Sequence, residues 1–120
     1  MDDEAFIREL AVEMIEKIGG YKVTVAKDGE EAIHLYQQAL EAGTAFDAVV
    51  LDLTVRGGMG GKEAIEKLLE IDPKVKAIVS SGYSTDPVMS NFRMYGFQEA
   101  VKKPYQIKEM SKALQSVLAA

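Results

Sequence analysis

Three apolar stretches of the sequence each end in polar residues that could carry chemistry. Asp52 stands near the end of AVVLDL, Ser80 and Ser81 close VKAIVSS, and Lys102 and Lys103 follow FQEAV. An ionised Asp within so apolar a run is costly to bury without a partner. The three stretch ends therefore offer a carboxylate, hydroxyl groups and ammonium groups, provided that the fold brings them together.

Two further carboxylates, Asp2 and Asp3, stand at the start of the chain. Together with Asp52 they would repel one another and favour a hard divalent cation, for which Mg²⁺ is suited because it takes oxygen ligands. A lysine and a hydroxyl beside such a metal suit the oxygens of a phosphoryl group. The chemistry implied is phosphoryl transfer to Asp52 as the nucleophile. The plainer interpretation of the acidic start is capping of the first helix.

Helical and strand-like patterns alternate along the chain and would position these residues. Strands are predicted at 21–26, 48–53, 75–81 and 97–102. Helices are predicted at 4–18, after Asp28-Gly29, between a glycine-rich loop at 57–61 and Asp72, from Asp86 to Tyr95, and at 106–118. This alternation predicts an α/β fold with a doubly wound parallel sheet. Ligands of such sheets bind beyond the carboxyl ends of the strands, which is where the polar residues stand.

Composition limits the classes of protein that the chain can represent. The 120 residues, 48% of them hydrophobic, suit one domain. A net charge of −5 argues against a nucleic-acid or anionic membrane surface, and an acidic start is the reverse of a signal peptide. Without Cys and with one His, thiol chemistry and multi-histidine metal sites are excluded. We expect a soluble, cytoplasmic domain without membrane contact.

The segments DDE, VVLDLT, SSGYS and KKPY, in this order, resemble the receiver domain of two-component response regulators. The resemblance covers residues 1–120 and implies the flavodoxin-like receiver fold. The wording around 57–63 and 80–87 is most similar to receivers of hybrid sensor histidine kinases. By this resemblance the chain is a phosphoacceptor, not an enzyme, and takes a phosphoryl group from a histidine kinase or a phosphotransfer protein.

The resemblance also assigns a metal site. Asp52 matches the phosphoacceptor, and Asp2 and Asp3 match the acidic pair that holds Mg²⁺, with Asp3 the direct ligand. The backbone carbonyl of Thr54 matches a further ligand.

Other residues match the switching parts of the family. Ser81, rather than Ser80, matches the hydroxyl that closes on the phosphoryl group, and Lys103 matches the family lysine, joined to Pro104 by a cis peptide bond. The side chains of Thr54 and Tyr83 stand where the family tunes attack of water on the phosphoaspartate.

Three departures from the family pattern leave alternatives open. Val55-Arg56 replaces a frequent Met-Pro, and Ala100 replaces the aromatic switch residue. The family's first, central strand, which ends in the acidic pair, is missing before Asp2. One alternative is therefore a pseudo-receiver that binds partners without phosphorylation. A hydrolase of the haloacid-dehalogenase type would need an acid/base Asp where Thr54 stands.

The missing strand leads to structural expectations of its own. Strands 21–26 and 48–53 would be left with facing unpaired edges. Either strand 21–26 pairs with strand 48–53 in a four-stranded sheet, or a second copy fills the gap in a homodimer or strand-exchanged assembly, which we favour. In both cases Asp2 and Asp3 are expected to lie away from Asp52, with weak metal binding as the result.

Overall fold

The structure, a computed structural model, describes residues 1–83 and 85–119. In chain order the elements are α1 (Ala5–Gly19), α2 (Gly29–Glu41), β1 (Val49–Asp52), α3 (Gly61–Ile71), β2 (Ala77–Ser81), α4 (Pro87–Ser90), the 3₁₀ helix η1 (Phe92–Tyr95), β3 (Glu99–Lys102) and α5 (Ile107–Ala119). No helix within these residues has the length and apolar character needed to cross a bilayer.

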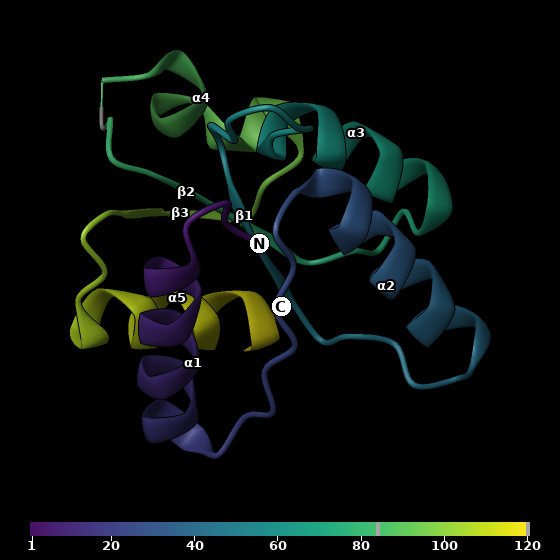
Figure 1. The fold of residues 1–120 in the computed structure, drawn as a ribbon, viewed down its shortest axis with the longest axis horizontal. Coiled ribbons are helices and arrows are strands. Elements are labelled where there is room, and N and C mark those ends of the chain that lie inside the picture. Colours follow the sequence, from purple (N-terminus) through teal and green to yellow (C-terminus); the bar gives the residue numbers. More distant parts are fainter. Residues whose placement is uncertain (84, 120) are drawn as a thin grey trace.

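The three strands form one parallel sheet in the order β1-β2-β3. Helices cover both faces: α1 and α5 lie on one side, α2 and α3 on the other (Figure 1). Each face has its own apolar core, and alternate residues of β2 serve the two, since Val79 packs towards α3 and Ile78 towards α5. Such two-sided burial explains the unbroken apolar runs, and it confirms the predicted α/β fold with its parallel sheet.

The predicted strand 21–26 is wrong, and so is the four-stranded sheet, because within the described residues this segment pairs with no strand. The backbone of Met1 and Asp2 lies between segment 21–26 and β1. Met1 donates its ammonium to the Val50 carbonyl (2.7 Å) and accepts from the Asp52 amide (3.0 Å), while the Asp2 amide donates to the Ala26 carbonyl (3.0 Å). These two residues hold the segment and β1 apart. The homodimer stays a prediction.

The helix expected from Asp86 to Tyr95 is broken into α4 and η1. Asp86 caps the first piece as predicted, accepting from the Val88 amide (2.9 Å). At Asn91 the backbone leaves the helical region (φ −123°, ψ 40°), and its side-chain amide donates to the Pro87 carbonyl (3.2 Å). Local side-chain bonding of this kind competes with helix continuation.

Candidate functional site

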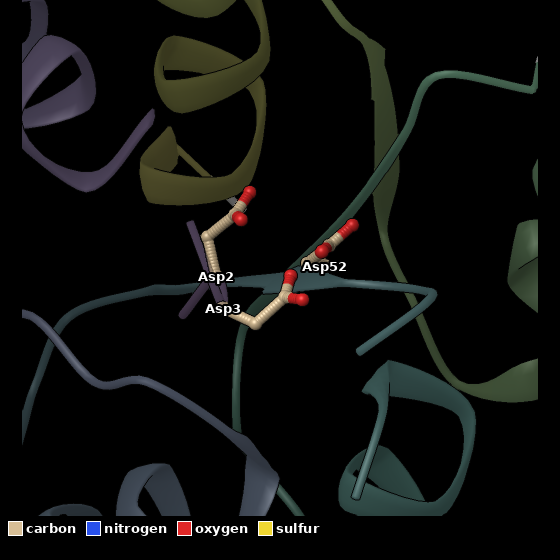
Figure 2. Close-up of side chains that lie close together, drawn as sticks. All are labelled: Asp2, Asp3 and Asp52. Carbon is tan, nitrogen blue, oxygen red and sulfur yellow. The ribbon is translucent and has the colours of Figure 1, made fainter. Parts of the chain in front are cut away.

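Three carboxylates meet at the carboxyl edge of the sheet (Figure 2). Asp2, Asp3 and Asp52 each offer an oxygen that lies within 4.8 Å of those of the other two. Asp2 and Asp52 are each only 3% exposed. The expectation that Asp2 and Asp3 lie away from Asp52 is therefore wrong.

Hydrogen bonds of the first two residues explain why the acidic pair stays in place. Met1 bonds to Val50 and Asp52, the two residues that flank Leu51. Met1 therefore occupies the position of a strand residue opposite Leu51. The Asp2 carbonyl accepts from Arg8 Nη1 (2.8 Å), and its carboxylate Oδ1 accepts from the Glu4 amide (3.0 Å). One residue of strand-like pairing and one turn at the start of α1 are thus enough to orient both carboxylates.

Lys103 joins two of the carboxylates. Its Nζ lies 2.6 Å from Asp2 Oδ2 and 2.9 Å from Asp52 Oδ1. The Lys103 amide donates to the Ser81 carbonyl (2.9 Å), which places the residue just beyond β3, and the Lys103–Pro104 bond is cis as predicted. The predicted approach of Lys103 to Asp52 is confirmed.

Burial and mutual repulsion set the acidity of the cluster. Burial raises the pKa of Asp52 to about 6, and the neighbouring Asp2 and Asp3 charges add to this, although Lys103 opposes it. Burial alone would lower the pKa of Lys103, but hydrogen bonds to Asp2 and Asp52 raise it instead. At neutral pH the site therefore holds an ionised Asp52 and a firmly protonated Lys103.

The two adjacent serines that end β2 differ in their partners. Ser80 Oγ accepts from the buried hydroxyl of Tyr105 (2.9 Å), so this side chain is committed to the core beneath the site. Ser81 Oγ accepts from the Tyr83 amide (3.0 Å), which leaves its own proton for another acceptor. This difference is consistent with Ser81 as the serine that serves the site. The sequence alone did not single out Tyr105.

The loop after β1 contributes a backbone group that the sequence did not reveal. The Arg56 amide donates to Asp3 Oδ2 (3.2 Å). Burial opposes a fall in the pKa of Asp3, but this hydrogen bond and the nearby positive charges lower it. Arg56 stands where many receivers carry a proline, which has no N–H to donate. The departure thus supplies a new contact to the acidic cluster.

The remaining predicted site residues lie at the rim. Thr54 follows β1 by two residues and is exposed, and the Tyr83 side chain is 70% exposed. Within the part of the chain that the structure describes, neither side chain forms a hydrogen bond or ion pair in the site, so their assigned roles stay predictions.

The donor set fits a hard divalent cation. It consists of three carboxylates, two of them buried, and Mg²⁺ binds through one or two carboxylates while keeping several waters. Repulsion among the carboxylates is only partly offset by Lys103, and a cation would complete the balance.

Comparisons with known proteins agree in one family. A family model, the response regulator receiver domain, matches residues 1–115. The chemotaxis protein CheY of Thermotoga maritima is 30% identical over 117 residues, 98% of this chain and 92% of that protein.

Two solved structures show the same fold. A chain of the CheX-CheY-BeF3-Mg complex from Borrelia burgdorferi gives a TM-score of 0.85 at 23% identity, over 97% of this chain and 84% of that chain. The second is the receiver domain of a sensor histidine kinase from Pseudomonas aeruginosa, solved with a magnesium ion in its active-site cleft. It gives a TM-score of 0.85 at 19% identity, over 100% of this chain and 94% of that chain.

Proposed function

The chain belongs to the response regulator receiver family, and from this premise we propose that it works in a phosphorelay with Asp52 as the phosphoacceptor. The observation that carries the proposal is the contact of Lys103 Nζ with both Asp2 and Asp52, next to Asp3. This arrangement supports a role for Asp52 that is chemical rather than structural, since burying it next to two like charges raises its pKa.

The proposed reaction moves a phosphoryl group from a phosphohistidine of a histidine kinase or phosphotransfer protein. A carboxylate oxygen of Asp52 attacks phosphorus, the O–P bond forms and the N–P bond breaks. The imidazole leaves as a neutral group, because its other ring nitrogen carries a proton throughout. Lys103 neutralises charge on Asp52 and on the incoming oxygens. The Ser81 hydroxyl donates a hydrogen bond to a phosphoryl oxygen once the group is on Asp52.

Asp3 and Asp52, with the Thr54 carbonyl and with Asp2 behind them, are the residues that would hold Mg²⁺. The ion would supply positive charge to the transferring phosphoryl group. An ordered Arg56 amide on Asp3 supports a preformed site, because it fixes this carboxylate before any metal arrives.

We further propose that residues 1–120 are the receiver of a longer hybrid histidine kinase. The support is the similarity of 57–63 and 80–87 to such receivers. Reading the native gene on both sides of this segment decides the matter: a kinase core in the same reading frame is the expected result, and its absence would overturn this part of the proposal.

Phosphorylation is tested with a small phosphodonor such as acetyl phosphate in the presence of Mg²⁺. Intact-mass spectrometry should show the addition of one phosphoryl group, and none for Asp52→Asn or in excess chelator. Asp47→Asn changes an exposed Asp just before β1; it is the matched control and should be phosphorylated like the unaltered protein. An unchanged mass for the unaltered protein would overturn the proposal in favour of a pseudo-receiver.

A further inference from the structure

The connection between β3 and α5 carries Lys103 and is anchored at two points to the end of β2. Before Pro104, the Lys103 amide donates to the Ser81 carbonyl (2.9 Å). After Pro104, the Tyr105 hydroxyl donates to Ser80 Oγ (2.9 Å). Both anchors of this connection therefore lie on the two serines that close β2.

The second anchor is one that the backbone does not supply. Pro104 has no N–H to donate. Within the part of the chain that the structure describes, the amides of Tyr105 and Gln106 donate no backbone hydrogen bond, and α5 begins at Ile107. Among the described residues between Lys103 and α5, the Tyr105 hydroxyl alone forms a hydrogen bond to the sheet.

The acceptor of this bond, Ser80, lies directly beside the proposed phosphoacceptor. In the parallel pairing of β1 with β2, Ser80 is the register partner of Asp52, so both side chains project from the same face of the sheet. Tyr105 approaches from that face, since it belongs to the core between the sheet and α5. Ser80 is 0% exposed and Tyr105 8%, so the loss of the bond would leave a buried hydroxyl unpaired.

The contacts of Lys103 depend on where its backbone is held. Its side chain is a flexible four-carbon stem, and its Nζ reaches Asp2 Oδ2 (2.6 Å) and Asp52 Oδ1 (2.9 Å) at the same time. A hydrogen bond tolerates a change in distance of only a few tenths of an ångström. A small displacement of the Lys103 backbone would therefore break one of the two contacts.

We propose that Tyr105 is a positioning residue for phosphoryl transfer: its hydroxyl bond to Ser80 holds Lys103 in a fixed relation to Ser81 and Asp52. This inference rests on the proposed function of Asp52. Tyr105 acts through Lys103 and not on the phosphoryl group itself. Lys103 and the Ser81 hydroxyl both act on phosphoryl oxygens, so their relative position decides how well they stabilise the transition state.

The first test removes the hydroxyl and keeps the ring, in Tyr105→Phe. Phosphorylation by acetyl phosphate with Mg²⁺ is followed over time by intact-mass spectrometry. The rate constant at saturating donor should fall about tenfold and the half-saturating donor concentration should change less than about twofold, because Lys103 acts on the transition state. A rate constant within about threefold of that of the unaltered protein would overturn this inference and leave the proposed function intact. Failure of the unaltered protein to be phosphorylated would overturn the proposed function instead.

Tyr36→Phe is the matched control for a merely structural loss. Tyr36 is 2% exposed, and its hydroxyl donates to Asp72 (2.6 Å), which follows the last residue of α3, whereas the site lies near the first. Each variant loses one hydroxyl bond and should lower the Tm by about 5 °C. Only Tyr105→Phe should slow phosphorylation; an equal loss of rate in both variants would contradict the inference.

Removing the acceptor gives an independent test. Ser80→Ala should slow phosphorylation as much as Tyr105→Phe does, because each variant loses the same bond. The double variant should then be no slower than either single variant. Losses that add up in the double variant would show that the two hydroxyls act separately, against the inference.

A spectroscopic readout does not depend on phosphorylation. NMR spectra of the lysine ammonium groups in isotope-labelled protein should contain a signal of Lys103, identified by its absence in Lys103→Arg, because two carboxylates hold this ammonium. The signal should persist in Tyr36→Phe and should shift or broaden in Tyr105→Phe. An unchanged signal in Tyr105→Phe would mean that Lys103 is held without the Tyr105 hydroxyl, and the inference would be wrong.

Discussion

Asp52 is the residue at which stability and chemistry oppose each other. Its carboxylate is buried beside two other carboxylates, and Lys103 compensates only part of the repulsion. A residue that raises the free energy of the folded state while serving the site is expected where function, rather than stability, selected it.

Replacing Asp52 by Asn should therefore stabilise the protein in the absence of metal. The raised pKa, about 6 against an ordinary 3.8, corresponds to a gain of about 1–3 kcal/mol in the free energy of unfolding at pH 7. Urea unfolding with a chelator present measures it, and Asp47→Asn, at an exposed position, should change little. A less stable Asp52→Asn protein would show that the ion pair with Lys103 stabilises the fold by more than burial of the Asp52 charge destabilises it.

The same residue predicts a pH dependence. Because the folded-state pKa lies above the unfolded one, the folded protein binds the Asp52 proton more readily. Protonation then stabilises the fold as the pH falls from about 6 to about 4, and this contribution is lost as the pH rises again. The stability advantage of Asp52→Asn should be largest above pH 6 and vanish below pH 4. Other groups titrate in both proteins and cancel in the difference, which unfolding curves at several pH values give directly.

At the scale of elements, two glycines allow the start of α3 to lie close to the end of β1. A Cβ on Gly60 would lie 2.5 Å from the Leu53 carbonyl oxygen, and one on Gly61 would lie 2.9 Å from that of Asp52. Backbone oxygens cannot swing aside as a flexible side chain can. The two glycines thus permit α3 to begin directly behind the end of β1.

Gly60→Ala should accordingly destabilise the protein by about 1–3 kcal/mol, because the helix start or the strand end must shift. The backbone at Gly60 is extended and suits Ala, so any loss comes from crowding alone. Gly82→Ala is the matched control, since nothing lies within 4 Å of a Cβ at that position. Chemical denaturation compares the two variants; equal stability would mean that the loop relaxes without cost.

The elements also show what the sequence can and cannot predict. Buried parallel strands are visible in a sequence because both faces are apolar, so 48–53 and 75–81 were recognisable. The alternation of YKVTVA predicts a strand equally well, but a strand also needs a partner. Among the described residues, the one main-chain bond to this segment joins the Asp2 amide to the Ala26 carbonyl.

The site was predictable in its side chains but not in its backbone. Asp52, Ser81 and Lys103 stand at strand ends, and the parallel topology brings strand ends to one edge of the sheet. The contacts of Met1 with Val50 and of Arg56 with Asp3 depend on main-chain groups that every residue has. No residue type signals them, which is why the position of the acidic pair was predicted wrongly.

For the whole molecule, the free energy of local opening is expected to be highest at β2 and to decrease towards the edges of the sheet. All five residues of β2 are buried, and β2 pairs on both sides, whereas half of the residues of segment 21–26 are exposed. Regions that lack buried contacts and backbone bonds open at the lowest free energy.

Hydrogen exchange followed by mass spectrometry should therefore find β2 amides the slowest and those of Lys22–Val25 among the fastest. Thr44, in another exposed segment, has an amide bonded to the Ala39 carbonyl (2.9 Å) and provides an internal comparison. Slow exchange in segment 21–26 would mean that its amides are bonded to acceptors, for example in a second copy of the chain.

The direction of the Met1 nitrogen also matters for laboratory handling of the protein. Because that nitrogen points to the Val50 carbonyl from inside the fold, a purification tag joined to it would start beside β1 and not in solvent. The linker between tag and protein would then be held at high local concentration beside the cavity that lies between segment 21–26 and β1. An apolar linker would cover the apolar lining of this cavity, whereas a polyhistidine segment would bring ionisable rings next to it. Biochemical results obtained with tags on opposite ends of this chain should be compared as results on two different proteins.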